Sequence, residues 1–420
     1  MKKYSNVMNT NVTWIPQIPA HWKLQKINAL FTERKKKVSD KDYKPLSVTK
    51  KGILPQLEHA AKSNDSDNRK LVKKGDFVIN SRSDRKGSCG VSRLDGSVSL
   101  INIVLTPSNE LNSEYIHYLL RNYRFSEEYY RNGRGIVADL WTTRYSEMRT
   151  ILFPVPPRAE QDQIVRFLDW KVSEINKLIG IRRKEIKELE KLCWIVIVNA
   201  ISKVKQKNIS EWKRVRVKQI CRMQSGTNLI SQVIGQSGNY PVYGGNGLRG
   251  YYKNYTNDGQ YVIIGRQGAL AGNVHLVEGR FWATDHAIVV YCSKFLIPRY
   301  AYYLFTGMNL NQYAFNAAAQ PGLSVTKILN LQCDVPSVAR QLEIADRLDE
   351  ICIQLEKIVN NTKKKIKLLQ ELKSVIISDV VTGKIDVRNI PVPAYEHVDD
   401  LTADDGEGND EEPRIPGEED

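Results

Sequence analysis

The sequence predicts an α/β (or α+β) tandem repeat, in which two similar domains with curled mixed sheets are joined by two long antiparallel coiled-coil helices about a pseudo-twofold axis. Two highly charged segments each follow a Val-Pro turn, and the second turn lies 180 positions after the first (335 minus 155). Both segments carry small or apolar residues at alternating steps of three and four, the pattern of a coiled coil. The region between them repeats the plan of the region before the first, as an internal duplication would.

The two helix seams keep the same spacing along the repeat. The first seam consists of Leu168, Val172, Ile175, Ile179, Ile186 and Leu189, and the second of Leu348, Leu355, Val359, Ile366, Leu369 and Ile376. A polar residue interrupts both at the same place, Arg182 in the first and Thr362 in the second. Neither seam has an apolar cover of its own, so each helix is expected to cover the other. A pseudo-twofold makes this pairing antiparallel, although a parallel pairing would also bury both seams.

Shifts in composition divide the chain of 420 residues into five parts. We expect a first domain at residues 1–155, a central helix at 156–207, a second domain at 208–335, a C-terminal helix at 336–390 and an acidic disordered tail at 391–420. Each domain is long enough to bury a core of its own. Residues 396–420 hold twelve Asp or Glu and one Arg. Such a tail either keeps the protein in solution or competes for its basic surface.

The chain outside this tail is strongly basic. The formal net charge is +15 and the tail contributes −11, so the remainder carries about +26 (15 plus 11). A body this basic favours a polyanionic partner, with nucleic acid ahead of an acidic membrane face. The alternative is a generally basic protein whose charge is incidental.

The cysteines and the hydrophobic runs indicate the compartment. Six cysteines are scattered along the chain without a C-x-x-C pair, which favours a reducing environment over a disulfide framework or a zinc site. No signal peptide follows Met1 and no apolar run is long enough to span a bilayer. We therefore expect a soluble, cytoplasmic protein that makes no membrane contact.

Period-two apolar runs predict the strands of the first domain. These strands are expected at residues 45–49, 76–80 and 98–105. A polar, basic loop with glycine connects the last two strands at residues 81–90. Residues 112–130 are amphipathic and aromatic, and are expected to form a helix.

The second domain repeats this plan with different loop residues. Residues 240–250 form its most glycine-rich loop, and residues 261–268 form a strand that ends in a basic turn. Residues 281–290 are the next predicted strand, and residues 320–327 lead to the second long helix. Asp285 and His286 fall inside that strand, where a hydrogen-bonded core pair is a simpler interpretation than a catalytic pair.

Motifs for catalysis and for nucleotide or metal binding are absent from the sequence. The glycine-rich loop does not match G-x-x-x-x-G-K-[ST], and no dinucleotide-binding fingerprint opens a helix. The six histidines include no H-E-x-x-H, and no Ser or Cys nucleophile motif occurs. The chain is therefore not expected to be an enzyme or to hold a metal or a cofactor.

The basic, polar loops are the better candidates for function. Arg can bind guanine through two hydrogen bonds, Asn or Gln can bind adenine, and Lys can hold phosphates. Taken singly, each Arg is more simply a solvated surface charge, but basic loops at matching places in two domains favour DNA. The run at residues 34–37 is either a phosphate contact or a solvated face. The predicted DNA-binding residues are Lys50, Arg82, Ser83, Arg85, Lys86, Arg134, Tyr243, Asn246, Arg249, Arg266, Gln267 and Gln320.

Over about residues 12–390, the chain resembles the specificity (S) subunit of type I restriction–modification enzymes. The resemblance is carried by the tryptophan- and proline-bearing start, the two Val-Pro turns with Gln161 and Gln341 downstream, the two long helices, and the ending at residues 380–386. The first turn matches the P-P-x-x-E-Q pattern of the family. The second turn departs from it, with Ser337 and Arg340 in place of the second Pro and the Glu.

This resemblance implies two target-recognition domains, each reading one half of a bipartite, asymmetric DNA site. The paired helices would set the spacer length and dock two modification (methyltransferase) subunits. Restriction subunits for translocation and cleavage would complete a system that defends the cell against foreign DNA. S-adenosylmethionine, ATP and Mg would bind to those partners, and the chain itself would be non-catalytic. The alternatives are a coiled-coil scaffold with non-specific nucleic-acid binding and a small enzyme with a cryptic site.

Overall fold

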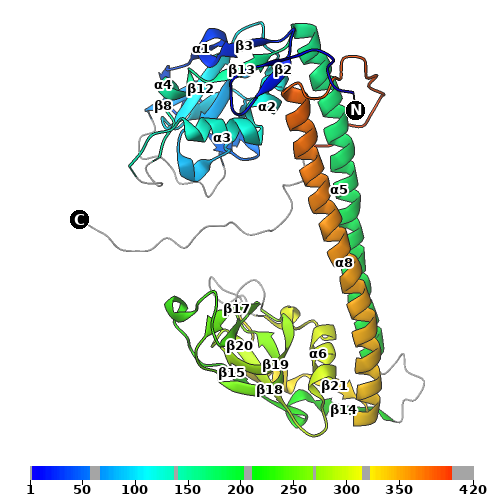
Figure 1. The fold of residues 1–420 in the computed structure, drawn as a ribbon. Coiled ribbons are helices and arrows are strands. Elements are labelled where there is room, and N and C mark those ends of the chain that lie inside the picture. Colours follow the sequence, from blue (N-terminus) through cyan, green and yellow to red (C-terminus); the bar gives the residue numbers. More distant parts are fainter. Residues whose placement is uncertain are drawn as a thin grey trace. The chain divides into compact units, whose positions relative to one another are not determined.

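The structure, a computed structural model, describes residues 2–56, 67–136, 141–202, 211–267, 271–314 and 322–399. The chain divides into two compact units (Figure 1). Unit 1 comprises Met1–Arg182 and Lys364–Asp420, and unit 2 comprises Arg183–Lys363. Two long helices, α5 (Arg158–Ile201) and α8 (Val338–Val381), each contribute one part to unit 1 and the other part to unit 2.

Unit 1 is built from short antiparallel strands with helices packed against them. Its main sheet has the order β10-β9-β12-β4, and smaller sheets have the orders β11-β8-β5, β13-β3, β6-β7 and β1-β2. The strands are β1 (Val7–Asn9), β2 (Gln17–Pro19), β3 (Lys23–Lys26), β4 (Phe31–Glu33), β5 (Lys37–Val38), β6 (Leu46–Thr49), β7 (Gly52–Pro55), β8 (Arg69–Val72), β9 (Phe77–Asn80), β10 (Cys89–Val91), β11 (Gly96–Val98), β12 (Asn102–Pro107) and β13 (Leu152–Val155). The helices before α5 are α1 (Ile27–Leu30), α2 (Ser113–Leu120), α3 (Tyr123–Arg131) and α4 (Tyr145–Met148), with a 3₁₀ turn η1 (Ser83–Arg85).

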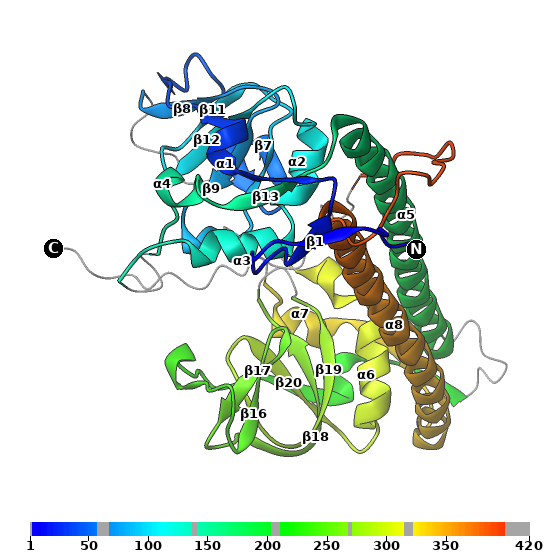
Figure 2. The same cartoon turned by 45° about the horizontal axis from the view of Figure 1, so that its top comes forward.

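Unit 2 contains one larger mixed sheet of order β15-β20-β18-β19-β16-β17, in which β16 runs parallel to β19 and the other pairs are antiparallel. Helix α6 packs against β18 and β19 (Figure 2). The strands are β14 (Lys213–Arg216), β15 (Cys221–Ser225), β16 (Tyr240–Gly244), β17 (Gly247–Tyr252), β18 (Asn257–Gly265), β19 (Val274–Ala283), β20 (Ala287–Cys292) and β21 (Gln332–Val335). The helices are α6 (Pro298–Gly307) and α7 (Val325–Asn330), with 3₁₀ turns η5 (Val217–Gln219), η6 (Ser231–Val233) and η7 (Leu310–Tyr313).

Helices α5 and α8 pair in an antiparallel manner within unit 1. Gln163, near the start of α5, donates to the carbonyl of Val387, just beyond the end of α8 (3.1 Å). Asn176, further along α5, accepts from Lys373, which lies earlier in α8 (3.2 Å). Moving forward along α5 therefore means moving backward along α8. The predicted fold class, an α/β chain with curled sheets and two long antiparallel helices, is confirmed, and the sheet that mixes parallel and antiparallel pairs is the one in unit 2.

The predicted seam residues are either buried or half-buried. Leu168, Ile175, Ile179, Leu348, Val359 and Ile376 are buried, and Val172, Ile186, Leu189, Leu355, Ile366 and Leu369 are half-buried. In unit 2 the helices meet through the cluster that contains Ile197, Ile344 and Leu348. This burial removes apolar surface from water, at about 25 cal/mol per Å².

A glutamine at the start of each long helix makes the same three backbone contacts. Gln161 Oε1 accepts from the N–H of Asn112 (2.8 Å), and its Nε2 donates to the carbonyls of Pro156 (2.9 Å) and Glu110 (3.2 Å). Gln341 Oε1 accepts from the N–H of Ile297 (3.0 Å). Each amide therefore joins its long helix to the loop that precedes α2 in unit 1 and α6 in unit 2.

The second glutamine completes this pattern, because its Nε2 donates to the carbonyls of Phe295 (2.8 Å) and Pro336 (3.0 Å). Both side chains are buried, at 1% exposed for Gln161 and 0% for Gln341. The departure of the second turn from P-P-x-x-E-Q, at Ser337 and Arg340, therefore leaves the contacts of its glutamine intact.

Replacing either glutamine by alanine is expected to destabilise its own unit by about 1–3 kcal/mol, because three buried or part-buried backbone groups lose their partner. Hydrogen exchange measured separately in each unit at increasing urea concentrations will give this loss of stability. Gln354, exposed on α8, is the matched control, and its replacement should change stability little. An equal loss at Gln354 would contradict this account of the buried amides.

Four predicted elements were placed incorrectly. The strand at 98–105 is interrupted after Val98 by a turn in which Asn102 donates to the carbonyl of Ser99, through both its backbone N–H (3.0 Å) and its side chain (3.1 Å). The helix at 112–130 is two helices, because the Asn122 side chain accepts from the N–H of Arg124 (2.8 Å) and caps α3.

The other two corrections lie in unit 2. The loop at 240–250 is a β-hairpin of β16 and β17, with Gly247 in the left-handed region (φ +87°). The strand at 281–290 is broken at residues 284–286, where the N–H of Ala287 donates to the carbonyl of Thr284 (3.0 Å). Asp285 is half-buried and His286 is exposed in this turn. The prediction of a core pair on a strand interior was therefore wrong.

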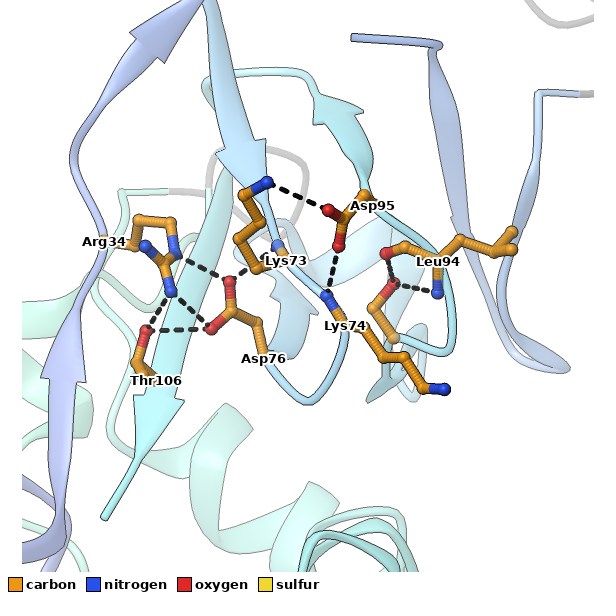
Figure 3. Close-up of polar contacts among 8 residues, drawn as sticks. Arg34, Lys73, Lys74, Asp76, Leu94, Asp95 and Thr106 are labelled. Atoms are coloured by element: carbon orange, nitrogen blue, oxygen red, sulfur yellow. Dashed lines mark hydrogen bonds and ion pairs between the residues drawn. The ribbon is translucent and has the colours of Figure 1, made fainter. Parts of the chain in front are cut away.

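Arg34, predicted as part of a phosphate-binding or solvated run, instead makes a largely internal ion pair (Figure 3). Its guanidinium donates two hydrogen bonds to Asp76, from Nε (2.7 Å) and Nη2 (3.0 Å), and one to Thr106 (2.9 Å). Asp76 is 2% exposed and also accepts from the Thr106 hydroxyl (2.8 Å) and from the N–H of Lys73 (2.8 Å). These contacts tie β4, β12 and the turn before β9 together.

The segment after α8 continues along α5. The Asn176 side chain donates to the carbonyl of Val398 (3.0 Å), and Lys177 pairs with Glu396 (3.1 Å). Residues 391–399 contain no helix or strand. The rest of the predicted acidic tail, residues 400–420, lies outside the described residues. Over the described part of the chain, no helix is both long and apolar enough to cross a membrane.

Candidate nucleic-acid interface

In unit 1, three backbone segments meet at the end of β9 and bring predicted loop residues together. Arg82 and Arg134 each form a β-bridge with Thr142. The N–H of Ser83 donates to the carbonyl of Trp141 (3.1 Å), and the N–H of Arg134 donates to the carbonyl of Thr142 (2.8 Å). These contacts bring together one loop cluster, which we call the unit 1 cluster and which consists of residues 82–86, Arg134, Trp141 and Thr142.

The cations of this cluster remain accessible. The side chains of Arg82 and Arg134 are 51% and 85% exposed, and that of Arg85 is 68% exposed. Arg82 lies near Asp84 (3.2 Å), and exposed pairs of this kind contribute little to stability. Phosphates or base edges can therefore replace these partners at low cost.

An aromatic wall borders the unit 1 cluster. The Lys86 ammonium lies over the Tyr130 ring (4.5 Å to its centroid) and pairs with Glu127 (2.7 Å). The hydrogen bond from Lys86 lowers the pKa of Glu127. Tyr130 packs against Trp141 (5.9 Å between ring centroids). Arg82, Ser83, Lys86, Tyr130 and Trp141 all line the same small pocket.

In unit 2, an equivalent cluster forms at the end of β18. Gln267 forms a β-bridge with Gly322, and the N–H of Leu323 donates to the carbonyl of Arg266 (2.8 Å). The N–H of Arg266 donates to the carbonyl of His286 (2.9 Å) in the turn between β19 and β20. A groove lined by Arg266, Gln267 and residues 322–326 opens beside these contacts.

The β16–β17 hairpin adds its tip to this unit 2 cluster. A Cβ atom on Gly245 would lie 3.0 Å from the carbonyl oxygen of His286 and 3.5 Å from that of Gln267. Glycine therefore allows the hairpin to approach both backbones closely. Asn246 and Arg249 are exposed at and beside the tip.

The two clusters are related by the internal duplication. In unit 1 the N–H of Thr143 donates to the carbonyl of Ser81 (2.9 Å). In unit 2 the N–H of Leu323 makes the equivalent hydrogen bond to the carbonyl of Arg266, and Leu323 lies 180 positions after Thr143 (323 minus 143). The bridge between Arg82 and Thr142 likewise corresponds to the bridge between Gln267 and Gly322. The equivalent positions therefore carry an arginine in one unit and a glutamine in the other.

Three predicted site residues are placed differently. Lys50 is exposed on the turn between β6 and β7, where its carbonyl accepts from Arg121 (2.6 Å). Tyr243 is half-buried, with its ring packed against Phe281 (5.8 Å between centroids), and burial raises its pKa. Gln320 lies outside the described residues.

Sequence reasoning missed Trp141, Thr142 and His286 as members of the clusters. Thr142 lies next to the loop cations only because the chain returns to the end of β9 after α3. The 180-residue offset between Thr142 and Gly322 was a usable signal. His286 was assigned to a strand interior, which concealed its place beside Arg266. Among the described residues, no group of three His, Cys, Asp or Glu side chains is arranged to hold a metal ion.

Comparison with known proteins places this architecture in a class. Residues 209–368 match the family model of the type I restriction modification DNA specificity domain. One solved structure comes from a study of the structural basis of complex assembly and conformational transition of the type I R-M system. Its match covers 88% of this chain and 99% of the chain in that structure, with a TM-score of 0.66 and 15% sequence identity. At this identity the match shows a shared fold.

Two curated relatives agree with this class. The type I restriction enzyme EcoprrI specificity subunit of Escherichia coli is 38% identical over 201 residues, which cover 47% of this chain and 49% of the relative. A putative type I restriction enzyme specificity subunit of Haemophilus influenzae is 30% identical over 118 residues, covering 27% of the chain and 30% of the relative. The matches thus span half or less of these relatives. Most of unit 2 lies within the residues that match the specificity-domain model, and the resemblance of the chain to type I specificity subunits is confirmed.

Proposed function

We propose that this chain is the DNA-recognition subunit of a type I restriction–modification enzyme, in which each unit reads one half of a bipartite, asymmetric target. The observation that carries the proposal is the pair of loop clusters. They occupy equivalent backbone positions but present different side chains, Arg82 in unit 1 and Gln267 in unit 2. Arginine favours guanine and glutamine favours adenine in the major groove. One scaffold used twice with different readers suits a target whose halves differ.

The proposed division of labour leaves catalysis to partner subunits. S-adenosylmethionine would bind to two modification subunits, and ATP and Mg would bind to restriction subunits. An exposed apolar stripe of α8 within unit 1 supports docking on the helices, because Leu368, Leu372 and Val375 are 62%, 48% and 55% exposed. Their spacing of four and three places them on one helix face. Contiguous exposed apolar surface of this kind marks interaction sites.

The competing function is a coiled-coil scaffold that binds nucleic acid without sequence preference. The salt dependence of binding alone does not separate the two, because phosphate contacts produce it in both cases. A preference for a two-part sequence belongs only to the proposed function. Methylation mapping in a host, with and without this chain, would supply that sequence.

The test is binding of duplexes that carry changes in one target half, measured with the modification subunits present. We expect Arg82→Ala to reduce discrimination at one half and Gln267→Ala to reduce it at the other. Each loss should be about 5- to 150-fold, since a bidentate contact contributes about 1–3 kcal/mol. Loss of discrimination at both halves from one variant would contradict the proposal.

Matched controls are available in each unit. Arg93 in unit 1 is 69% exposed and pairs with Glu114 (3.5 Å), and Arg222 in unit 2 lies over the Tyr291 ring (4.4 Å). Replacing Arg93 or Arg222 by alanine removes one positive charge and leaves both loop clusters unchanged. Discrimination between target sequences should then remain. If full-length protein with the modification subunits binds all duplex sequences equally, the scaffold function is favoured. If it binds no duplex even at low salt, both functions are contradicted.

A further inference from the structure

Two cysteines face each other across the paired helices of unit 2. Cys193 on α5 and Cys352 on α8 bring their Sγ atoms to 3.3 Å. Both thiols are free and half-buried. Both residues continue the helix seams, so the packing of α5 against α8 holds the two sulfur atoms together. A disulfide requires about 2 Å between sulfur atoms, which leaves a shift of about 1 Å for side-chain rotation.

Cys193 also differs chemically from the other cysteines, because its pKa alone is lowered. The Cys352 thiol hydrogen-bonds to Cys193 and lowers the pKa of Cys193 to about 7, while the pKa of Cys352 is raised by the same contact. Burial raises the pKa of Cys89, Cys221 and Cys292 to about 12 and that of Cys333 to about 11. The thiolate is the reactive form, so oxidation is expected to begin at Cys193, and the contact at 3.3 Å places Cys352 next to the oxidised sulfur.

We propose that Cys193 and Cys352 form a reversible disulfide that covalently joins α5 to α8 in unit 2. The Cys193 thiolate attacks a peroxide, forming a sulfenic acid and releasing water after protonation. The Cys352 sulfur then displaces the sulfenic oxygen, which leaves as a second water. Two thiols are oxidised, two protons and two electrons pass to the peroxide, and a dithiol reductant reverses the step.

The disulfide reduces the conformational freedom of the unfolded chain more than that of the folded chain. It closes a loop that runs from Cys193 to Cys352 and contains the elements from β14 to β21. This loop is almost the whole of unit 2 apart from its segments of α5 and α8. A cross-link over a long loop removes conformational freedom from the unfolded state. The packed helices already hold the two residues together. Oxidation should therefore raise the melting temperature of unit 2 without changing its fold.

The experiment treats full-length protein with hydrogen peroxide, alkylates the remaining thiols and maps cross-linked peptides by mass spectrometry. We expect a peptide pair joined at Cys193 and Cys352 with the loss of two hydrogens, and a raised melting temperature that a dithiol reductant reverses. The rate of thiol loss should rise about tenfold between pH 6 and pH 8 and then level off, as a group with a pKa near 7 requires. An ordinary thiol would keep gaining rate above pH 8.

Variants provide the controls. Cys193→Ser and Cys352→Ser should each abolish the cross-link and the rise in melting temperature, and Cys292→Ser should retain both. The wild-type mapping does not depend on how these variants fold. The proposal is overturned if both thiols stay open to alkylation after peroxide treatment. A cross-link that forms first between Cys221 and Cys292, which face each other across β15 and β20, would overturn it equally.

Discussion

Replacing Asp76 by alanine is expected to lower the free energy of unfolding of unit 1 by about 3–5 kcal/mol, a large share of the stability of a typical domain. The substitution removes the carboxylate to which the Arg34 guanidinium donates two hydrogen bonds. It also removes the acceptor for the Thr106 hydroxyl and for the backbone N–H of Lys73. Asp76 is buried and Arg34 is half-buried, so removing the carboxylate leaves the arginine partly desolvated and without its counter-charge, which costs more than the pair contributes. Hydrogen exchange of β9 and β12 in increasing urea will measure the loss.

The neighbouring turn supplies a matched control for Asp76. Asp95 accepts from the Lys73 ammonium (2.9 Å) and from the N–H of Lys74 (2.7 Å), but its side chain is 52% exposed. Asp95→Ala removes a carboxylate from the same region, and water replaces its contacts, so the loss should be much smaller. Equal losses for the two variants would show that burial of Asp76 is not the cause.

Much of the fold could be predicted from local sequence patterns. The seams around Leu168 and Leu348 predict two long helices, because a period near 3.5 has no other stable structure. The breaks were missed where a single side chain decides the geometry. Asn122 ends one helix by capping the next, and Asn102 closes a turn inside an apolar run. Propensity averaged over a window does not register such single contacts.

The loop clusters were only half predictable for a similar reason. Arg82, Arg134, Arg266 and Gln267 were found because basic and amide side chains flanked by glycine or serine stand out in the sequence. Thr142 and His286 reach the same places through backbone pairing with distant segments, which composition does not encode. Arg34 shows the opposite error. Its charge predicted a position on the surface, but the carboxylate of Asp76, 42 positions away in the sequence, holds it in an ion pair.

Adding one heptad to both α5 and α8 is expected to lengthen the spacer of the preferred DNA target by about three base pairs. Seven residues extend a helix by about 10.5 Å, and base pairs are about 3.4 Å apart. Both helices run from one unit into the other without interruption, so added turns in both lengthen the connection between the proposed readers. Methylation mapping of a host that carries the lengthened chain will give the new spacer.

Seven residues are the right insertion because they return each seam to almost the same face, with a drift of only about 20°. Insertions beside Ile186 and Val359 keep the change within the unit 2 parts of the helices. The control adds the heptad to α5 alone. That change shifts one seam against the other, unpairs contacts such as Cys193 with Cys352, and should abolish target recognition. If the chain with both helices lengthened folds and the host genome is still methylated at the original target, the helices do not set the spacer, because recognition is then independent of their length.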